Sequence, residues 1–285
     1  MEIFHNIEGY GAWYSELNLK NVSVGFVPTM GALHKGHLSL IEASKRDNDY
    51  TVCSIFVNPT QFNDKSDYQK YPRTSDDDIE VLRGQYCDVL FAPATDEMYP
   101  DNGQNKQRAS IDLGQIAEVM EGQFRPGHFD GVVTIVTKLF DIIKPNKAYF
   151  GQKDFQQLAI IRRMSEELGI PVKIIGCPTV REDDGLALSS RNLLLSPAQR
   201  AEAPTIYQSL LKSKNRLGQQ NVKQTKQRLI DEINTSTILD VEYVEIADSH
   251  SLQPIESWGN AESVICCVAV HAGGVRLIDN IMLYN

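Results

Sequence analysis

The sequence lacks the features of a zinc-binding, disulfide-bonded or membrane-inserted protein. Its five cysteines show no C-x-x-C spacing, and most stand in apolar, strand-like runs, which predicts reduced core residues. No apolar run approaches the length that spans a bilayer. Because Met1 is followed by Glu2 and Glu8 rather than by a basic and then an apolar segment, we expect no secretion or membrane insertion and a cytoplasmic location.

An excess of positive charge is also missing. The 285 residues carry a formal net charge of -9, whereas tight nonspecific binding to nucleic acid or to anionic lipid depends on clustered Lys and Arg. We expect neither partner, although local basic residues remain free to bind phosphate groups. The length exceeds what most single hydrophobic cores use, which predicts one large domain or two smaller ones and favours two.

Two common nucleotide-binding motifs are absent. Gly31 and Gly36 have the spacing of a Walker A loop, but the second glycine is followed by His37 and Leu38 instead of Lys and Ser or Thr. No G-x-G-x-x-G fingerprint follows the first buried strand, so NAD-type binding is not expected. The sequence also shows no Ser-His-Asp or Cys-His set for nucleophilic catalysis.

The chain does contain two histidines around a glycine, in residues 28–37 (PTMGALHKGH). The preceding run, residues 22–27, is typical of a buried strand, and an apolar helical pattern begins just after Gly36. At such a helix N-terminus, unpaired backbone N–H groups and the imidazoles of His34 and His37 would attract phosphate. A lone histidine is more often a packing or capping residue, but a pair at a strand-to-helix switch favours a nucleotide site.

Strands and helices alternate through the first 177 residues, which predicts the α/β class with a Rossmann-like doubly wound parallel sheet. After a boundary near Pro178, polar helices and alternating strands predict a smaller C-terminal α+β domain with an antiparallel sheet. The expected domains are residues 1–179 and a lid domain of residues 180–285. Strands are expected at 22–27, 51–57, 88–92, 148–150, 172–177, 241–246 and 263–270, and helices after Gly36, from Thr74 or Ser75, at 130–144, at 155–168 and from Ser196 to about Thr235.

Polar clusters follow several expected strands, where open parallel sheets bind their ligands. Asn58 and Gln61 offer amides to a small polar substrate, although an ordinary Asn-Pro turn is an equally good interpretation. Residues 151–157 (GQKDFQQ) hold a lysine that would reach phosphate at a helix start, where a plain capped helix is the alternative. Residues 186–192 (LALSSRN) place two hydroxyls and a guanidinium together, which suits triphosphate oxygens.

Six segments in order resemble the pantoate-beta-alanine ligase family, and the resemblance covers nearly the whole chain. The segments are PTMGALHKGH, FVNPTQF, YPRTSDDD, EGQFRPGHFDGV, GQKDFQQL and DGLALSSRN, with RLIDN near the end. The resemblance implies ATP-dependent ligation of pantoate and beta-alanine to pantothenate through pantoyl adenylate, with release of pyrophosphate and AMP. It also implies Mg²⁺ with the ATP and a homodimer, for which the strongly apolar helix at 130–144 is a second argument.

The resemblance assigns roles to individual residues. Catalysis would use His34, His37, Lys153 and Arg191, with His37 as the catalytic histidine. Pantoate would be held by Asn58, Gln61 and Gln157, with Gln61 also near beta-alanine. Asp77 and Asp78 would help to place magnesium. The alternative is that three aspartates in the first turn of a helix only stabilise it through a favourable interaction with the helix dipole. The ATP-binding residues would be Met30, Gly31, Ala32, Leu33, His34, Lys35, Gly36, His37, Gly151, Gln152, Lys153, Asp154, Val180, Leu188, Ser189, Ser190 and Arg191.

This chemistry needs no general base, because the attacking carboxylate is already ionised near neutral pH and adenylation requires positioning and charge neutralisation. Two other functions remain open. A nucleotidylyltransferase of the HxGH superfamily would transfer a nucleotide to a phosphorylated acceptor, which calls for more basic residues than Asn58, Gln61 and Gln157 provide. A noncatalytic RNA-binding relative of class I aminoacyl-tRNA synthetases would need a basic face, which the acidic balance disfavours.

Overall fold

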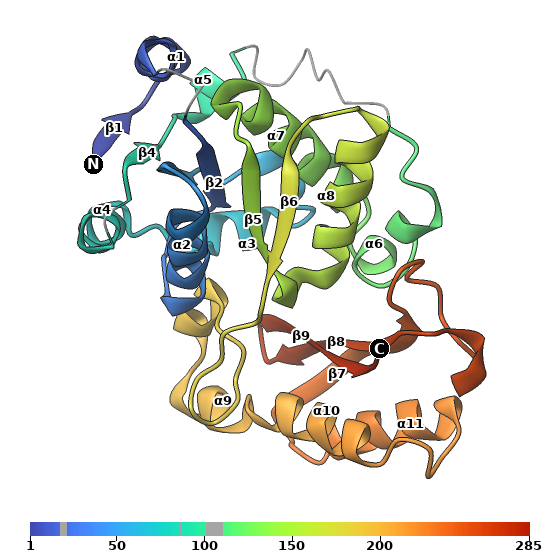
Figure 1. Ribbon diagram of the computed structural model, residues 1–285. Coiled ribbons are helices and arrows are strands. Elements are labelled where there is room, and N and C mark those ends of the chain that lie inside the picture. The colour runs from blue at the N-terminus through green and yellow to red at the C-terminus, as the bar shows by residue number, and fades with distance from the viewer. Residues whose placement is uncertain (18–21, 86, 101–110) are drawn as a thin grey trace. The chain divides into compact units, whose positions relative to one another are not determined.

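The computed structural model describes residues 1–17, 22–85, 87–100 and 111–285. The chain folds into two compact units. Unit 1 comprises Met1–Leu113, Arg125–Gln152 and Ile160–Pro178, and unit 2 comprises Gly114–Phe124, Lys153–Ala159 and Thr179–Asn285. Each unit contains a sheet of its own (Figure 1). The main division lies beside the boundary expected from the sequence, but two earlier segments join the C-terminal unit.

Unit 1 is built on a six-stranded sheet in the order β1-β4-β3-β2-β5-β6, and all of its pairings are parallel. The predicted doubly wound sheet is therefore confirmed. The chain runs outward from β2 through β3 and β4 and then returns to the other side of β2 with β5, so the strand order reverses between β2 and β5. Ligands bind at such switch points, beyond the carboxyl ends of the strands. The strands are β1 (Glu2–Phe4), β2 (Val24–Thr29), β3 (Tyr50–Ile55), β4 (Val89–Phe91), β5 (Lys147–Gly151) and β6 (Lys173–Cys177).

The helices of unit 1 follow the sequence signals closely. The helix expected at 130–144 is α7, with Lys144 at its C-cap in a left-handed conformation just before Pro145, which cannot continue a helix. Most apolar side chains of α7 are already buried within the chain. The large number of apolar residues in this helix is therefore no argument for a homodimer. The helices are α1 (Ile7–Glu16), α2 (Lys35–Asp47), α3 (Lys65–Lys70), α4 (Ser75–Gly84), α5 (Thr95–Met98), α7 (His128–Ile143) and α8 (Phe155–Glu167), whose first turn belongs to unit 2.

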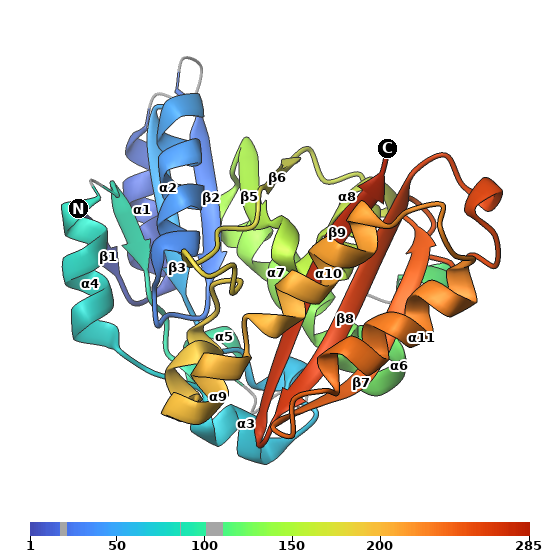
Figure 2. The ribbon, with the colours of Figure 1, turned by 90° about the horizontal axis from the view of Figure 1, so that it is seen from below.

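Unit 2 contains an antiparallel sheet of β7 (Leu239–Asp248), β8 (Val264–Ala272) and β9 (Val275–Tyr284), in that order. Its helices are α6 (Glu121–Phe124), α9 (Pro197–Glu202), α10 (Thr205–Asn215) and α11 (Val222–Ile233). Helices α10 and α11 lie along the sheet (Figure 2), and their apolar side chains form one core with it. A second cluster on this sheet includes Met120, Phe155 and Ala159. These contacts explain why residues 114–124 and 153–159 belong to unit 2.

None of the helices that the structure describes combines the length and the apolar character needed to cross a membrane. All five cysteines are buried and free, as their positions in apolar runs predict. Burial raises the pKa of the Cys87 thiol to about 11 and that of Cys266 to about 12. These thiols stay protonated near neutral pH and act as small apolar core residues.

Candidate active site

Two histidines cap the helix that starts at the end of β2. His34 is the N-cap of α2, and its Nδ1 accepts a hydrogen bond from the Gly36 backbone N–H (3.1 Å). The Nδ1 atom of His37 accepts in turn from the His34 backbone N–H (3.3 Å), and the two rings stack with centroids 4.0 Å apart. A nitrogen that accepts carries no proton, so both neutral rings bear their N–H on Nε2. The turn thus supplies two Nε2–H donors at the switch point of the sheet.

The backbone of this turn is capped by the protein itself. The Gly31 N–H donates to Thr29 Oγ1 (3.2 Å), and the Ala32 and Leu33 N–H groups donate to the carboxylate of Asp78 (2.9 and 2.7 Å). These three amides are paired within the protein, and the contact of residues 31–33 with ATP stays a prediction. The imidazoles, rather than the backbone of residues 31–33, are the donors that this turn offers to an anion.

Asn58 and Gln61 lie in the turn after β3, where the 3₁₀ helix η1 (Pro59–Gln61) begins. The Asn58 side chain is 1% exposed; its Nδ2 donates to Gln61 Oε1 and to the Gly131 carbonyl (both 3.1 Å). Its Oδ1 accepts from the Tyr99 hydroxyl (2.8 Å) and from Thr60. Because both ends of the Asn58 amide are engaged, this residue orients Gln61. The sequence gives no indication that Tyr99 is part of this turn. Burial raises the pKa of its hydroxyl.

Helix α7 holds the same turn from behind. A Cβ atom at Gly131 would lie 2.4 Å from the Thr60 carbonyl oxygen, so only glycine permits this close approach. Arg125 Nη1 lies 3.2 Å from His128 Nε2; since a guanidinium only donates, Nε2 accepts and Nδ1 carries the proton. His128 Nδ1–H then donates to the Gln61 carbonyl (2.8 Å). Residues 125–131 of the segment EGQFRPGHFDGV therefore support the Gln61 turn, a role that the sequence motif alone does not indicate.

In unit 2 the segment with the two serines folds back on itself. The Leu188 N–H donates to the Val180 carbonyl (3.0 Å), and Arg181 and Ala187 form a β-bridge. Ser189 then caps the short helix η4 (Ser190–Leu194) by accepting from the Arg191 N–H (3.3 Å). The structure thus brings Val180, Leu188 and the serines into one hairpin.

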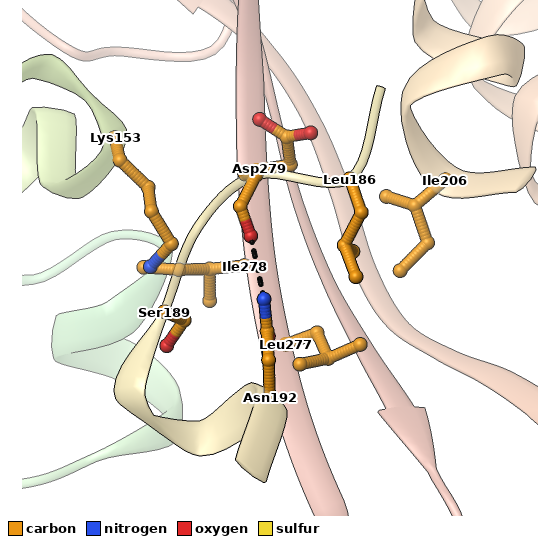
Figure 3. A pocket seen from close by; sticks show the side chains of 9 residues that line it. Lys153, Leu186, Ser189, Asn192, Ile206, Leu277, Ile278 and Asp279 are labelled. Atoms are coloured by element: carbon orange, nitrogen blue, oxygen red, sulfur yellow. Dashed lines mark hydrogen bonds between the residues drawn. The ribbon is translucent and has the colours of Figure 1, made fainter. Parts of the chain in front are cut away.

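A pocket of unit 2 contains two of the predicted ATP-binding residues, Lys153 and Ser189 (Figure 3). Asn192 also lines it and donates from Nδ2 to the Ala187 carbonyl (3.1 Å), whereas no described residue donates to its buried Oδ1. The lining residues are Lys153, Leu186, Ala187, Ser189, Asn192, Ile206, Leu277, Ile278 and Asp279.

The RLIDN segment, for which the sequence offers no role, lies in β9 and connects three other motifs within unit 2. Asp279 accepts two hydrogen bonds from Arg181 (2.7 and 2.9 Å), which fixes the hairpin. Asn280 Nδ2 donates to the Lys153 carbonyl (2.8 Å). Arg276 bonds to both Glu121 oxygens (2.7 Å each). Side chains of β9 therefore position both segments that line the pocket.

Arg276 is the centre of a partly buried ionic group. Besides Glu121 it bonds Glu242 (2.6 and 3.0 Å), and the Tyr243 hydroxyl also donates to Glu121 (3.0 Å). Burial opposes ionisation of Glu242, but hydrogen bonds and positive charge from Arg276 and His271 outweigh it and lower the pKa of that carboxyl. The pKa of Arg276 is raised, because its two carboxylate partners outweigh the opposing effect of burial.

The remaining predicted residues divide between the two units. Gly151 ends β5, and Lys153 lies in the 3₁₀ helix η3 (Gln152–Asp154) with Nζ 3.9 Å from Asp154. Gln157 is half-buried in the first turn of α8, and Met30 contacts Gln61 Nε2 through its sulfur (3.1 Å). Lys35 opens α2.

The acidic residues of α4 do not form a cage for magnesium. Asp77 is exposed, and both oxygens of Asp78 accept from backbone N–H groups. Within the described ranges, no three His, Cys, Asp or Glu side chains gather where they could hold a metal ion. The role of Asp77 and Asp78 in placing Mg²⁺ stays a prediction.

A doubly wound parallel sheet with an HxGH helix start at its switch point defines a nucleotide-binding α/β protein. The model of the family "Pantoate-beta-alanine ligase" matches residues 2–282, and the chain belongs to this family. It is 48% identical over 281 residues to the pantothenate synthetase of Bacteroides fragilis, covering 99% of this chain and 98% of the relative.

Two crystal structures extend the comparison. The pantothenate synthetase of Thermus thermophilus has a TM-score of 0.92 at 40% identity, covering 100% of both chains. The pantoate-beta-alanine ligase of Francisella tularensis, complexed with beta-gamma ATP and beta-alanine, has a TM-score of 0.83 at 39% identity, covering 99% of this chain and 98% of the other. The expected family and the expected class of enzyme, a ligase that forms an amide bond, are confirmed. The nucleotidylyltransferase alternative is not favoured.

Proposed function

We propose that this chain joins pantoate to beta-alanine in two steps. In the first, a pantoate carboxylate oxygen attacks the α-phosphorus of ATP and pyrophosphate leaves, which gives pantoyl adenylate. In the second, the amine of beta-alanine attacks the acyl carbon, loses a proton and displaces AMP, which gives pantothenate. The observation that carries this proposal is the stacked, neutral His34–His37 pair at the switch point, in a chain that matches the ligase family over residues 2–282.

The first step moves negative charge onto the departing pyrophosphate. The Nε2–H groups of His34 and His37 are held by backbone caps, so they need no reorganisation when they donate to phosphate oxygens. Lys153, Ser189 and Arg191 supply the other donors for the triphosphate. Mg²⁺ bound to ATP would screen the phosphate charge and, for this role, needs few protein ligands. The enzyme would work in the cytoplasm.

Gln61 and Gln157 are proposed to hold pantoate, with Gln61 also near beta-alanine, and Asn58 acts by orienting Gln61. We expect Gln61→Ala to raise the KM for pantoate about tenfold, because a buried substrate oxygen or hydroxyl loses its partner. The KM for ATP should change less than about twofold. Steady-state kinetics with each substrate varied in turn measures both, and Gln69→Ala, at an exposed position of α3, is the matched control. A rise in the KM for ATP with an unchanged KM for pantoate contradicts this division of the site.

The proposed reaction is tested by its partial steps. Without beta-alanine, the enzyme should release pyrophosphate only when pantoate is present, and it should catalyse pantoate-dependent exchange of labelled pyrophosphate into ATP. Addition of beta-alanine should then yield AMP and pantothenate in equal amounts. Pyrophosphate release that requires a phosphorylated acceptor instead of pantoate would establish the nucleotidylyltransferase alternative.

We also propose that the protein is a homodimer, an inference that rests on the family resemblance. Light scattering coupled to size-exclusion chromatography should give twice the chain mass of 32.0 kDa at micromolar concentration. The mass of a single chain at that concentration excludes the dimer.

A further inference from the structure

The turn between β2 and α2 contains two consecutive residues in the left-handed region. Gly31 has φ +79° and Ala32 has φ +48°. Glycine adopts this conformation at no steric cost, but alanine does not, so Ala32 needs support from its surroundings. The geometry of this turn sets where His34 begins α2 and hence where both imidazoles point.

Asp78 supplies that support from another helix. Its carboxylate is buried (2% exposed), and each oxygen accepts a different backbone N–H, from Ala32 (2.9 Å) and from Leu33 (2.7 Å). The Asp78 N–H itself donates to the Thr74 carbonyl (2.8 Å), which ties this residue into the first turn of α4. Hydrogen bonds to an ionised acceptor are stronger than those between neutral groups. The fit is close, since a Cβ at Gly31 would lie 3.0 Å from Asp78 Oδ2.

We propose that Asp78 is a positioning residue for adenylation, which holds the left-handed turn at Gly31–Ala32 so that the Nε2–H groups of His34 and His37 are aimed at the phosphates. This inference rests on the proposed function of the histidine pair. It assigns Asp78 to the protein backbone rather than to a magnesium ion, since each oxygen accepts a backbone N–H and no described cluster of His, Cys, Asp or Glu could hold a metal. It also means that the amides of Ala32 and Leu33 take no part in phosphate binding.

Asp78→Asn tests the proposal with little change of shape. An amide accepts one of the two N–H groups but presents its own N–H₂ to the other, so the turn loses its second anchor. We expect the rate of pantoate-dependent pyrophosphate exchange to fall about 10- to 100-fold, as expected when one or two buried hydrogen bonds are lost. The Mg²⁺ concentration for half-maximal rate should stay unchanged. Asp76→Asn, in the same helical turn but exposed, removes the same charge and should keep its rate within about twofold.

A double variant distinguishes positioning from a general loss of stability. If Asp78 acts through the imidazoles, Asp78→Asn should slow the His37→Ala enzyme by a smaller factor than it slows the unsubstituted enzyme, because only His34 remains to be positioned. Multiplied effects of the two substitutions would overturn the proposal. So would a rate that high Mg²⁺ restores, which is the behaviour of a metal ligand, or a rate for Asp78→Asn equal to that of the unsubstituted enzyme.

Thr29→Val provides a milder test if Asp78→Asn does not fold. It removes the acceptor of the Gly31 N–H from the same turn without changing side-chain size. Exchange should slow about threefold or more, again without a shift in Mg²⁺ dependence; an unchanged rate counts against control by the turn. If the unsubstituted enzyme itself shows no pantoate-dependent exchange, the proposed function fails. Activity in that enzyme with no effect of Asp78→Asn refutes only the positioning role.

Discussion

Replacement of His37 by alanine is expected to lower the rate of pantoate-dependent pyrophosphate release by about 10²- to 10³-fold. The reason is the loss of one donor that is already oriented towards developing charge, and such donors contribute this much in other enzymes. The same substitution removes the acceptor of the His34 N–H (3.3 Å), which is a capping interaction. A lost cap costs about 1 kcal/mol of stability, so the rate should fall far more than the fold is weakened.

Single-turnover measurement of pyrophosphate release reports this step without interference from product release. His37→Gln is the informative companion, because its amide N–H partly replaces the lost donor and should recover some of the rate. His250→Ala, at an exposed position in unit 2, is the control. A near-normal rate for His37→Ala would remove this residue from the mechanism.

The largest loss of stability is expected from Arg276→Met. This arginine pairs with Glu121 and Glu242, and the Glu121 side chain is only 9% exposed. Removal of the guanidinium leaves the buried Glu121 carboxylate without its cationic partner, which costs about 3–5 kcal/mol. By contrast, Arg163→Met breaks an exposed pair with Glu167, which should contribute less than about 1 kcal/mol.

Urea unfolding followed by fluorescence separates the two units. Trp258 lies in unit 2 and Trp13 in unit 1, so a Trp13→Phe background reports on unit 2 alone. The effect should depend on pH, because the pKa of Glu242 is lowered in the folded protein by Arg276 and His271 against the effect of burial. A lowered carboxyl pKa stabilises the fold above the normal value of 4.5 and loses that contribution as the pH falls through the shifted value.

The difference between Arg276→Met and the unsubstituted protein should therefore be largest near neutral pH and should shrink as the pH falls below about 4.5. A variant as stable as the Arg163→Met control at pH 7 would show that the ionic group contributes little net stability. A pH-independent loss would indicate that packing of the arginine side chain, rather than its charge, is what matters.

Much of unit 1 is predictable because strands covered on both faces are continuous apolar runs, and those runs alternate with helical patterns. The strands β2 to β6 and helix α7 stand where this alternation places them, within a few residues. Strand β1 cannot be predicted from the sequence, because its three residues are too few to show the alternation of a strand. Strand β9 is missed because Arg276, Asp279 and Asn280 interrupt the apolar pattern, although each is paired inside the protein.

The partners of the site residues are decided only by the tertiary structure. Asp78 meets the amide of Ala32 across 46 positions of sequence, and Arg276 meets Glu121 across 155. Neither pairing follows from local propensity, because each depends on which elements become neighbours in space. The Asn58 amide is a group that commonly binds polar substrates. In this fold, however, its Nδ2 donates to Gln61 and its Oδ1 accepts from Tyr99.

The sequence by itself determined the family, the alternation of strands and helices in the doubly wound sheet, and the position of the histidine pair at a strand-to-helix switch. All three depend only on local residue patterns and on the order of the motifs along the chain. The tertiary structure decided which nitrogen of each imidazole carries the proton, which backbone amides are already capped, and which segments belong to unit 2. The physical reason is that hydrogen bonds and buried charges are satisfied by whatever lies nearby, and in a folded chain the nearest partner is often far away in sequence.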